Sequence, residues 1–456
     1  MIPHRRFVPQ LLVLTLLVAV QVPAPPAPAA AGRPDWAFSP APALLPCPEG
    51  LRPAVGFWKA IFSRYSRDQT ILHDAEHVEI VYEVVNTSGT RSERERVQRV
   101  KAAIKHHRDL LRDLVRKPPE HRTAEERRIA RRFAQVPGAS LDGAAYRVRA
   151  QRGLRERFRR GLVRAGRWQA MMIEVFRSYG VPPQITVLPH VESSFNPEAH
   201  SRAGAVGIWQ FTRSTGRRYL RIGYDIDERR DVLAATHAAA RHLRDNYRDL
   251  HSWPLAIIAY NHGAAGMRRA VEQLGTRNVE TIIADYRSRT FRFASRNFYP
   301  EFLAALEIAW DPELYFGPLS YERPLPLETF VLPAYATASA VSQALRVSPS
   351  ELRVLNPALG RTFWTDRQPL PKGYTLKIPA GTVDDLHGAF AGIPRDQRWD
   401  EAPQPPAYRV RWGDTLSAIS HRFGIRLRDL KAVNDLRGDR IYAGQTLYLP
   451  VDPASR

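Results

Sequence analysis

Glu192 and a series of neutral polar residues after it are the side chains that could do chemistry together. Glu192 follows an apolar stretch, and the later members are Ser201 and Gln210 of a glycine-containing loop and the Tyr260-Asn261 pair. A carboxyl group with apolar neighbours keeps its proton to a higher pH, because desolvation disfavours its charged form. Amides, hydroxyls and aromatic rings are the groups that hold sugars. The set therefore favours cleavage of a glycosidic bond in which one carboxyl group moves the proton.

The environment of Glu192 depends on the helix in which it lies. If residues 185–195 are helical, Leu188 and Phe195 share its face of that helix. Their apolar side chains would raise the pKa of the carboxyl group to about 6, where it can still donate a proton to a glycosidic oxygen. The alternative is a surface glutamate near a helix start, where the helix dipole stabilises its charge.

The other members of the series have ordinary structural explanations when each is taken alone. Gly204 and Gly207 allow close backbone approach to a helix or to a ligand, or they mark a tight turn. Trp209 offers an aromatic face, Tyr260 also fits a packed core, and Asn261 also fits a helix C-cap. The order of the whole series is what favours a saccharide site.

Helical periodicity between residues 166 and 310 supplies the frame for these side chains. Apolar residues recur there at steps of three or four. We expect helices over Arg167–Tyr179, Val232–Leu250, a stretch opened by Ser252, and Tyr299–Trp310. The predicted fold class is mainly α.

The region before residue 166 predicts further helices and no chemical motif. A helical stripe covers Ser92–Val115, Thr123 is an expected N-cap, Leu141–Val163 is predicted as a basic helix, and a short strand is predicted at Val78–Tyr82. Arginine runs such as Arg155–Arg160 contribute to a net charge of +21. This charge favours a polyanionic partner, although solvated helix faces are the simpler explanation of the runs.

The chain after about residue 320 contains two copies of one pattern, a strand followed by two short helices and a second strand. The copies share apolar residues and an asparagine at a constant offset, namely Val341 with Ile419, Leu352 with Leu430, and Asn356 with Asn434. A proline-rich join between the copies is predicted as a semi-rigid linker. The sequence therefore predicts two small βααβ modules of the α+β type.

The stretch from about Arg167 to Ala309 resembles the goose-lysozyme-like catalytic domain of bacterial lytic transglycosylases, most closely the membrane-bound lytic transglycosylase D type. The resemblance depends on the motifs Glu192-Ser193, Ser201-x-x-Gly-Ala-x-Gly-Ile-Trp-Gln-Phe211, Thr215-Gly-Arg217, Asp227-Glu-Arg-Arg-Asp231 and Ala259-Tyr-Asn261. Residues 408–450 resemble a LysM module, with Trp412-Gly-Asp-Thr-Leu416 as the turn into its first helix. The unit at about 328–380 resembles a degenerate module of the same kind.

The resemblance implies a reaction. Glu192 would protonate the bond that follows an N-acetylmuramic acid unit, and the N-acetyl group of the sugar would stabilise the oxocarbenium-like centre. Glu192 would then act as the base while the C6 hydroxyl attacks C1, which leaves a 1,6-anhydro end. Ser201, Gln210, Tyr260 and Asn261 would line the saccharide cleft, and no metal or organic cofactor is implied.

Two positions depart from the family pattern. His262 stands where the family has alanine, and we interpret it as a substitution at the cleft edge. The late family motif Glu-Thr-x-x-Tyr-Val is replaced by Ala294-Ser-Arg-Asn-Phe-Tyr299. Either Phe298 occupies the tyrosine position without a hydroxyl, or Tyr299 supplies the substrate contact from the next position.

A hydrolase would need a second carboxylate, as nucleophile or as base for water. Asp225, Asp227 and Asp231 are candidates only in principle, because their surroundings resemble a salt-bridged turn and helix start. A muramidase that uses water and a non-catalytic peptidoglycan-binding protein remain the alternatives.

The predicted domain boundaries follow from these features. Residues 1–31 are predicted as a signal peptide, because Arg5 and Arg6 precede an apolar run too short to span a bilayer comfortably. The remaining units are a Pro-rich lead-in and basic helical region at 32–165, a lysozyme-like transglycosylase domain at 166–312, a degenerate LysM-like module at 325–380, a linker at 381–407 and a LysM module at 408–451.

These features predict the compartment and the partners. Secretion would place the protein in the periplasm of a bacterial envelope, with an uncleaved membrane anchor as the alternative. The expected partners are peptidoglycan glycan strands, with the LysM module on GlcNAc-containing glycan, and peripheral contact with an anionic membrane. Nucleic acid is not expected for a secreted chain with glycan modules. The single cysteine, Cys47, excludes an intrachain disulfide and a thiolate zinc site.

Overall fold

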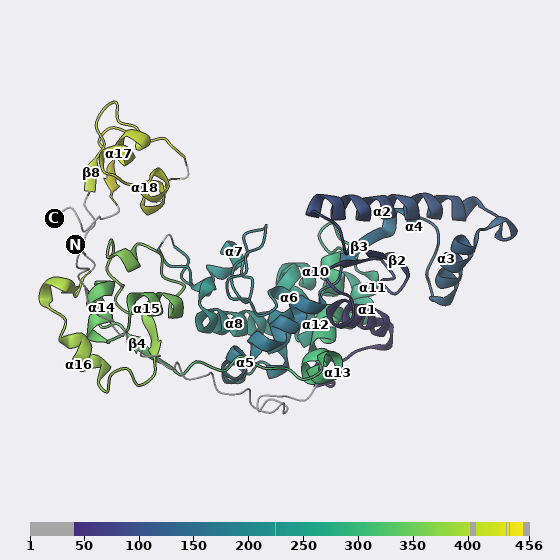
Figure 1. The fold of residues 1–456 in the computed structure, drawn as a ribbon, viewed down its shortest axis with the longest axis horizontal. Coiled ribbons are helices and arrows are strands. Elements are labelled where there is room, and N and C mark those ends of the chain that lie inside the picture. Colours follow the sequence, from purple (N-terminus) through teal and green to yellow (C-terminus); the bar gives the residue numbers. More distant parts are fainter. Residues whose placement is uncertain (1–40, 224, 402–406, 435, 437, 450–456) are drawn as a thin grey trace, which may run out of the picture.

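The computed structural model describes residues 41–449 apart from residues 224, 402–406, 435 and 437. The predicted signal peptide at 1–31 lies outside the described residues. Figure 1 shows a central helical body, an arm on one side of it and two small modules on the other side. Within the described part of the chain, no helix combines the length and apolar character needed to cross a membrane.

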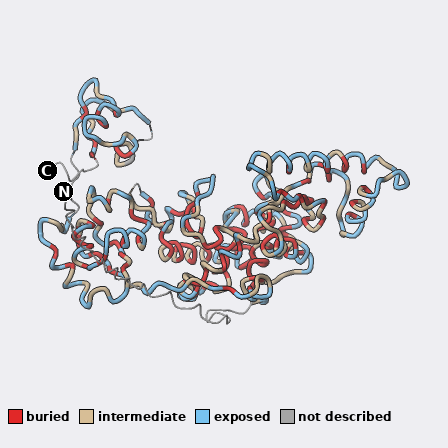
Figure 2. Tube along the Cα trace, in the orientation of Figure 1, coloured by how far each residue is buried: buried red, intermediate tan, exposed pale blue. Residues whose placement is uncertain are grey.

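The central body packs its helices around one large apolar core, and Figure 2 shows buried residues concentrated there. Its helices are α1 (Arg52–Ser63), α5 (Arg155–Ser178), α6 (Leu188–Glu192), α7 (Arg213–Gly216), α8 (Val232–Leu250), α9 (Trp253–His262), α10 (Ala264–Leu274), α11 (Val279–Asp285), α12 (Phe293–Trp310) and α13 (Pro312–Phe316). Short 3-10 segments are η1 (Glu49–Leu51), η3 (Pro183–Val187) and η4 (Glu228–Arg230). The mainly helical fold class is confirmed.

Side-chain caps explain where two of the long central helices begin. The Asp231 carboxylate accepts a hydrogen bond from the Ala234 amide at the start of α8, and the Ser252 hydroxyl does the same for the Leu255 amide at the start of α9. These bonds satisfy amides that have no partner inside the helix. The predicted starts of these two helices are therefore correct.

Helix α1 joins the core of the central body although it lies more than 100 residues before the predicted start of the catalytic region. It packs against α12, and the Trp58 indole donates to the Asn297 side-chain oxygen over 2.9 Å. Trp58, Ile61 and Phe62 are buried in the same cluster as the residues of α8 and α9. The segment before residue 166 thus completes the helical body.

The arm consists of a three-stranded antiparallel sheet with helices packed on it. The strand order is β2-β1-β3, with β1 (Gln69–Asp74), β2 (Val81–Asn86) and β3 (Val148–Arg152). The helical elements are α2 (Glu93–Arg116), η2 (Pro119–His121), α3 (Ala124–Gln135) and α4 (Ala144–Arg147). Ser92 caps α2 and Thr123 forms a capping box with Glu126 at α3, as their positions predict.

One predicted helix of the N-terminal region is wrong. Residues 141–163 contain the short helix α4, the strand β3 and the start of α5 instead of one basic helix. The reason is tertiary: β3 pairs along its whole length with the buried strand β1, with His73 opposite Arg149. Pairing with a neighbouring strand overrides the helical preference of this arginine-rich segment.

The two C-terminal modules repeat one structure. The first has β4 (Leu327–Val331), β5 (Tyr335–Ala336), α14 (Ala338–Ala344), α15 (Pro349–Leu355), η5 (Phe363–Thr365) and β6 (Thr375–Pro379). The second has β8 (Ala407–Arg409), α17 (Leu416–Arg422), α18 (Leu427–Val433) and β9 (Thr446–Tyr448). In each module the outer strands pair antiparallel around the two helices, as the repeat predicts.

The paired asparagines explain why the repeat is visible in the sequence. The Asn356 amide donates to the carbonyls of Leu352 and Lys377, and its oxygen accepts from the Lys377 amide. Asn434 makes the same three bonds, to Leu430 and twice to Tyr448. Each asparagine therefore ties the second helix of its module to the last strand.

The segment predicted as a linker, residues 381–407, contains ordered structure. It forms α16 (Leu386–Ala391), η6 (Arg395–Gln397) and β7 (Arg398–Trp399), and β7 pairs with β5. Phe390 and Ile393 are buried in the core of the first module. Apolar burial thus attaches most of this proline-containing segment to the first module.

Candidate active site

Glu192 is the last residue of the short helix α6, and the chain turns sharply after it. Ser194 and Phe195 both have a φ of 55°, in the left-handed region that side chains other than glycine rarely adopt. The condition of one helix over residues 185–195 is therefore not met, because η3 and α6 together end at Glu192. Phe195 is fully buried in the core, and its burial redirects the chain at this point.

Side chains from the turn itself and from α5 hold this turn. The Ser193 hydroxyl donates to the Ile208 carbonyl over 2.8 Å, which joins α6 to the glycine-containing loop. From α5, Arg157 donates through Nε to the Ser194 hydroxyl over 2.9 Å, and Arg164 donates to the Ser194 and Phe195 carbonyls. Carbonyls just after the end of a helix have no partner inside it, and the Arg164 guanidinium group supplies one here.

The carboxyl group of Glu192 lies in a desolvated environment. Burial raises its pKa from 4.5 to about 8. The side chain nevertheless keeps some accessible surface, and no hydrogen bond or ion pair to it occurs among the residues that the structure describes. The direction of the shift is the one predicted from its apolar neighbours, and the shift is larger. At pH 7 such a group holds its proton about nine-tenths of the time, as a general acid must.

Tyr260 joins α9 to the loop that contains Trp209. Its hydroxyl donates to the Trp209 carbonyl over 2.8 Å. Burial raises the pKa of Tyr260 well above 10, and the charge of Glu192 raises it further, so the phenol lies within electrostatic range of the Glu192 carboxyl group.

The loop after α6 is built on hydrogen bonds within itself. Gln210 has a φ of 51°, and its amide nitrogen donates to the carbonyls of Ala199 and Gly207 over 3.1 and 2.8 Å. The exposed Ser201 hydroxyl accepts a bond from the Ala205 amide. These contacts position the loop and leave the Ser201 hydroxyl at the surface.

Gly207 is required for packing. It has a φ of 84°, and a Cβ atom there would lie 1.9 Å from the Arg229 carbonyl oxygen. Two of the explanations open for this glycine are therefore supported, the close approach of two backbone segments and a tight turn, since the Gln210 amide donates to the Gly207 carbonyl over 3.2 Å.

Asn261 and His262 end α9 at the surface of the body. Asn261 is exposed, and its side-chain oxygen accepts a bond from the Ser295 hydroxyl over 3.1 Å. Burial lowers the pKa of His262, so its ring is neutral at pH 7. A neutral histidine at this edge fits the interpretation of His262 as a substitution beside the site.

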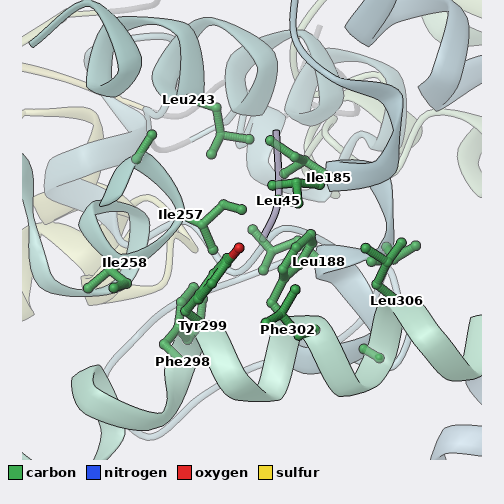
Figure 3. Packing of buried hydrophobic residues seen from close by; sticks show 14 of the residues in the cluster. Leu45, Ile185, Leu188, Leu243, Ile257, Ile258, Phe298, Tyr299, Phe302 and Leu306 are labelled. Atoms are coloured by element: carbon green, nitrogen blue, oxygen red, sulfur yellow. The ribbon is translucent and has the colours of Figure 1, made fainter. Parts of the chain in front are cut away.

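Two aromatic residues are core residues and cannot touch a ligand in this structure. Tyr299, predicted as a substrate contact, is 0% exposed, and its hydroxyl donates to the Pro46 carbonyl over 2.8 Å. Figure 3 shows it among the labelled side chains of Leu188, Ile257 and Phe302. Trp209 is equally buried and donates to Thr236. Both rings face the centre of the body because α12 and the loop pack against the core.

Glu301 on α12 is a second carboxyl group near Glu192, and the sequence analysis missed it. Burial raises its pKa to about 8, the charge of Glu192 raises it further, and Arg149 of the arm lowers it. The sequence contains a signal for it, because Glu301 interrupts the apolar run Phe298–Ile308. An acidic residue in a helix that is buried on several sides is rare without a function.

The three aspartates considered as a second carboxylate have structural partners. Asp227 pairs with Arg229 over 2.7 Å, and Asp231 caps α8 and pairs with Lys377 of the first module. Asp225 accepts a bond from Gln368 over 3.0 Å, also in the first module. The side chains of Asp225 and Asp231 attach the first module to the central body, while the Asp227–Arg229 pair lies within the turn and agrees with the expected salt-bridged turn.

Among the described residues, one cluster of side chains of the kinds that bind metal ions occurs, and it lies on the arm. Donor atoms of His106, His107 and Glu125 lie within 4.8 Å of one another. His107 already contacts Glu83 over 2.9 Å, and His106 contacts Glu125 over 3.3 Å. The three side chains therefore lie close together because each histidine of α2 pairs with a glutamate of a neighbouring element.

Comparison with known families identifies two parts of the chain. Residues 171–283 match the Transglycosylase SLT domain, and residues 408–450 match the LysM domain. These matches confirm the predicted resemblance: the chain combines an SLT-type, lysozyme-like domain with a C-terminal LysM domain.

Individual proteins are similar to parts of this chain. The chain is 31% identical over 284 residues to the membrane-bound lytic murein transglycosylase D of Escherichia coli (strain K12), over 59% of this chain and 60% of that protein. The chain therefore spans about 60% of the length of this curated relative. It is 44% identical over 48 residues to the cell wall-binding protein YocH of Bacillus subtilis, 10% of this chain and 17% of that protein. The lytic transglycosylase Slt of Pseudomonas aeruginosa matches 34% of this chain and 25% of its own, with 19% identity and a TM-score of 0.26.

Proposed function

We propose that this protein is a peptidoglycan lytic transglycosylase. It would cleave the β-1,4 bond between MurNAc and GlcNAc and leave 1,6-anhydroMurNAc ends during cell-wall remodelling. The observation that carries this proposal is the raised pKa of Glu192 beside Tyr260, within a domain that matches the SLT family. Glu192 is a half-buried residue, and a protonated carboxyl group is what the first step of the reaction needs.

The second carboxyl group favours transglycosylation over hydrolysis. A retaining hydrolase needs an ionised nucleophile, and an inverting hydrolase needs an ionised base for water. With a pKa of about 8, Glu301 is mostly protonated at pH 7 and supplies neither. The attacking group is then the C6 hydroxyl of the substrate itself, with Glu192 returning as base after it has given up its proton. A muramidase that uses Glu301 with water is the alternative.

The remaining predicted contacts belong to the same proposal. Ser201, Gln210 and Asn261 would line the saccharide cleft around Glu192 and Tyr260, while Tyr299 is no longer part of the set. The buried position of Tyr299 leaves no late tyrosine contact from α12.

The LysM module would hold the enzyme on its polymer. Trp412 is 94% exposed and Tyr442 is 62% exposed, and exposed rings are the groups that stack on sugar faces. Binding of GlcNAc-containing glycan there would raise the local substrate concentration. The first module is attached to the body through Lys377 and Asp231, which favours a packing role for it.

The proposed location is the periplasmic side of a bacterial envelope. The predicted signal peptide and the peptidoglycan substrate support it, with membrane anchoring through an uncleaved signal as the alternative. The excess of positive charge suits an anionic wall polymer or peripheral contact with an anionic membrane.

The test is mass spectrometry of sacculi digested by the full chain. Anhydro ends are the expected product, reducing ends would indicate the muramidase, and an intact polymer would indicate a binding protein. The Glu192→Gln variant should keep the fold and release nothing; turnover at the level of the unaltered protein would remove Glu192 from its role.

A further inference from the structure

A cavity of about 190 Å³ lies beside α6, and the proposed chemistry so far does not use it. Its walls come from α1, β3, the start of α5, α6 with the turn after it, and α12. The lining residues are Trp58, Phe62, Gln151, Leu154, Arg157, Phe158, His190, Val191, Ser194 and Glu301. The cavity therefore adjoins Glu192 through its neighbours in α6 and through Glu301, whose carboxyl group feels the charge of Glu192.

One residue of the cavity wall carries an unpartnered polar atom. His190 is 3% exposed, its Nδ1 has no hydrogen-bond partner among the described residues, and burial lowers its pKa to about 3, so the ring is neutral. This nitrogen lies toward Gly161 of α5, and Glu301 in the opposite wall is half-buried. The charged group that a ligand in the cavity would meet is therefore Arg157.

The charge around the cavity is positive. Arg157 lines it, and desolvation, followed by the nearby charge of Arg160, lowers the pKa of both Arg157 and Arg164. Arg149 of β3 interacts with Glu301 from the side of the arm. Arg157 has no carboxylate partner among the described residues, and its bond to Ser194 leaves other guanidinium donors unused. An anionic ligand would relieve the repulsion between these arginines.

We propose that this cavity is a subsite for a carboxylate on the lactyl arm of the muramoyl sugar, with Arg157 as its charged contact. The carboxylate would belong to the lactyl group itself on strands without peptides, or to the attached stem peptide. This inference rests on the proposed function and adds a substrate contact to it. Seven of the ten lining residues lie outside residues 171–283, so the subsite gives the N-terminal segment a role in substrate binding.

The size of the cavity agrees with a short substituent. A volume of 190 Å³ is about six times the volume that one water molecule occupies in the liquid. This space accommodates a carboxylate with its few attached carbon atoms better than a further N-acetylated sugar. The aromatic walls formed by Trp58, Phe62 and Phe158 would contact the methyl and methylene groups of the substituent.

The test measures kcat/KM of the full chain on three sets of glycan strands: strands with stem peptides, strands without peptides, and the latter after methyl esterification of their carboxylates. Arg157→Gln also removes the bond to Ser194, so kcat/KM on esterified strands measures the loss that comes from the turn alone. On strands with the recognised carboxylate kcat/KM should fall about tenfold further, because a charge-assisted hydrogen bond is lost as well. Further loss confined to peptide-free strands identifies the lactyl carboxylate, and further loss confined to peptide-bearing strands identifies the peptide. Arg159→Gln is the matched control, because Arg159 is on the same helix and exposed like Arg157 but does not line the cavity.

Equal loss on all three sets would overturn the proposal, because Arg157 would then act only through Ser194 and the turn after Glu192. No loss on any set would also overturn it. Gln151→Glu leaves the bond between Arg157 and Ser194 in place and adds a negative charge to the cavity wall. This variant should lower kcat/KM on strands that carry the recognised carboxylate and should change it little on esterified strands. The ends of the products report separately on the proposed function, since reducing ends would contradict transglycosylation while the charge selectivity still reports on the subsite.

Discussion

Replacing Glu192 by glutamine should stabilise the fold in a manner that depends on pH. The folded pKa of about 8 lies above the value of 4.5 expected for the unfolded chain. Below pH 4.5 both states hold the proton, and the substitution has little electrostatic effect. As the pH rises toward 8, the unfolded chain ionises while the folded protein stays protonated, so the unaltered protein loses stability.

The size of this loss of stability follows from the pH range over which only the unfolded chain is ionised. Each pH unit between 4.5 and 7 costs about 1.36 kcal/mol, which amounts to about 3 kcal/mol at pH 7. Glutamine has the same shape and never ionises, so Glu192→Gln should recover about that amount at pH 7 and almost none at pH 4. The same variant should lose cleavage, which makes it more stable and inactive.

The assay must report on the central body alone, because the chain has several separate cores and will not unfold in one step. Hydrogen exchange of the buried amides of α8 and α9 against denaturant, at pH 4 and pH 7, gives that local free energy. Glu198→Gln, an exposed change in the following loop, is the matched control and should show no such difference. Equal stability of Glu192→Gln and the unaltered protein at both pH values would refute the argument that desolvation keeps this carboxyl group protonated.

Three further predictions concern other parts of the structure. Glu301→Gln should keep anhydro products and most of the activity, because the carboxyl group is already neutral; a loss of about 100-fold or more in sacculus digestion would favour its use as a hydrolytic base. Gly207→Ala should destabilise the central body by about 2 kcal/mol or more in denaturant titration, because its Cβ would collide with the Arg229 carbonyl and its φ is positive; a neutral effect would contradict the close approach. Asn434→Ala removes the three bonds that join α18 to β9 and should abolish glycan pull-down by the LysM module while soluble-strand cleavage continues; retained pull-down would refute that role.

Local signals explain why much of the fold could be predicted. Helices α2, α3, α8 and α9 begin at Ser, Thr or Asp residues that cap them. The first three present an apolar stripe to the core, and α9 is buried on all sides from Trp253 to Ala259. The βααβ repeat is visible because each asparagine must make the same three bonds. These features depend on residues close together in the chain, and such residues leave a pattern in the sequence.

Features that depend on distant contacts could not be predicted in this way. The strand β3 forms because β1 offers it a partner more than 70 residues earlier, and nothing within the basic segment announces that pairing. The burial of Tyr299 depends on Pro46, which lies 253 residues away. Glu301 carried a local signal, but its nearness to Glu192 depends on how α12 packs against α6.

The helix α5 shows how a basic surface stretch can also support chemistry. The turn after Glu192 contains two residues with left-handed backbone, each costing on the order of 1 kcal/mol, and it persists because surrounding groups fix it. Arg157 and Arg164 do so by donating to Ser194 and Phe195. A guanidinium group keeps its charge at every pH at which the carboxyl group titrates, since its ordinary pKa lies above 12. Glu192 can therefore give up and regain its proton while the side chains that hold its turn stay in one charge state, which a lysine or histidine in a desolvated position would not guarantee.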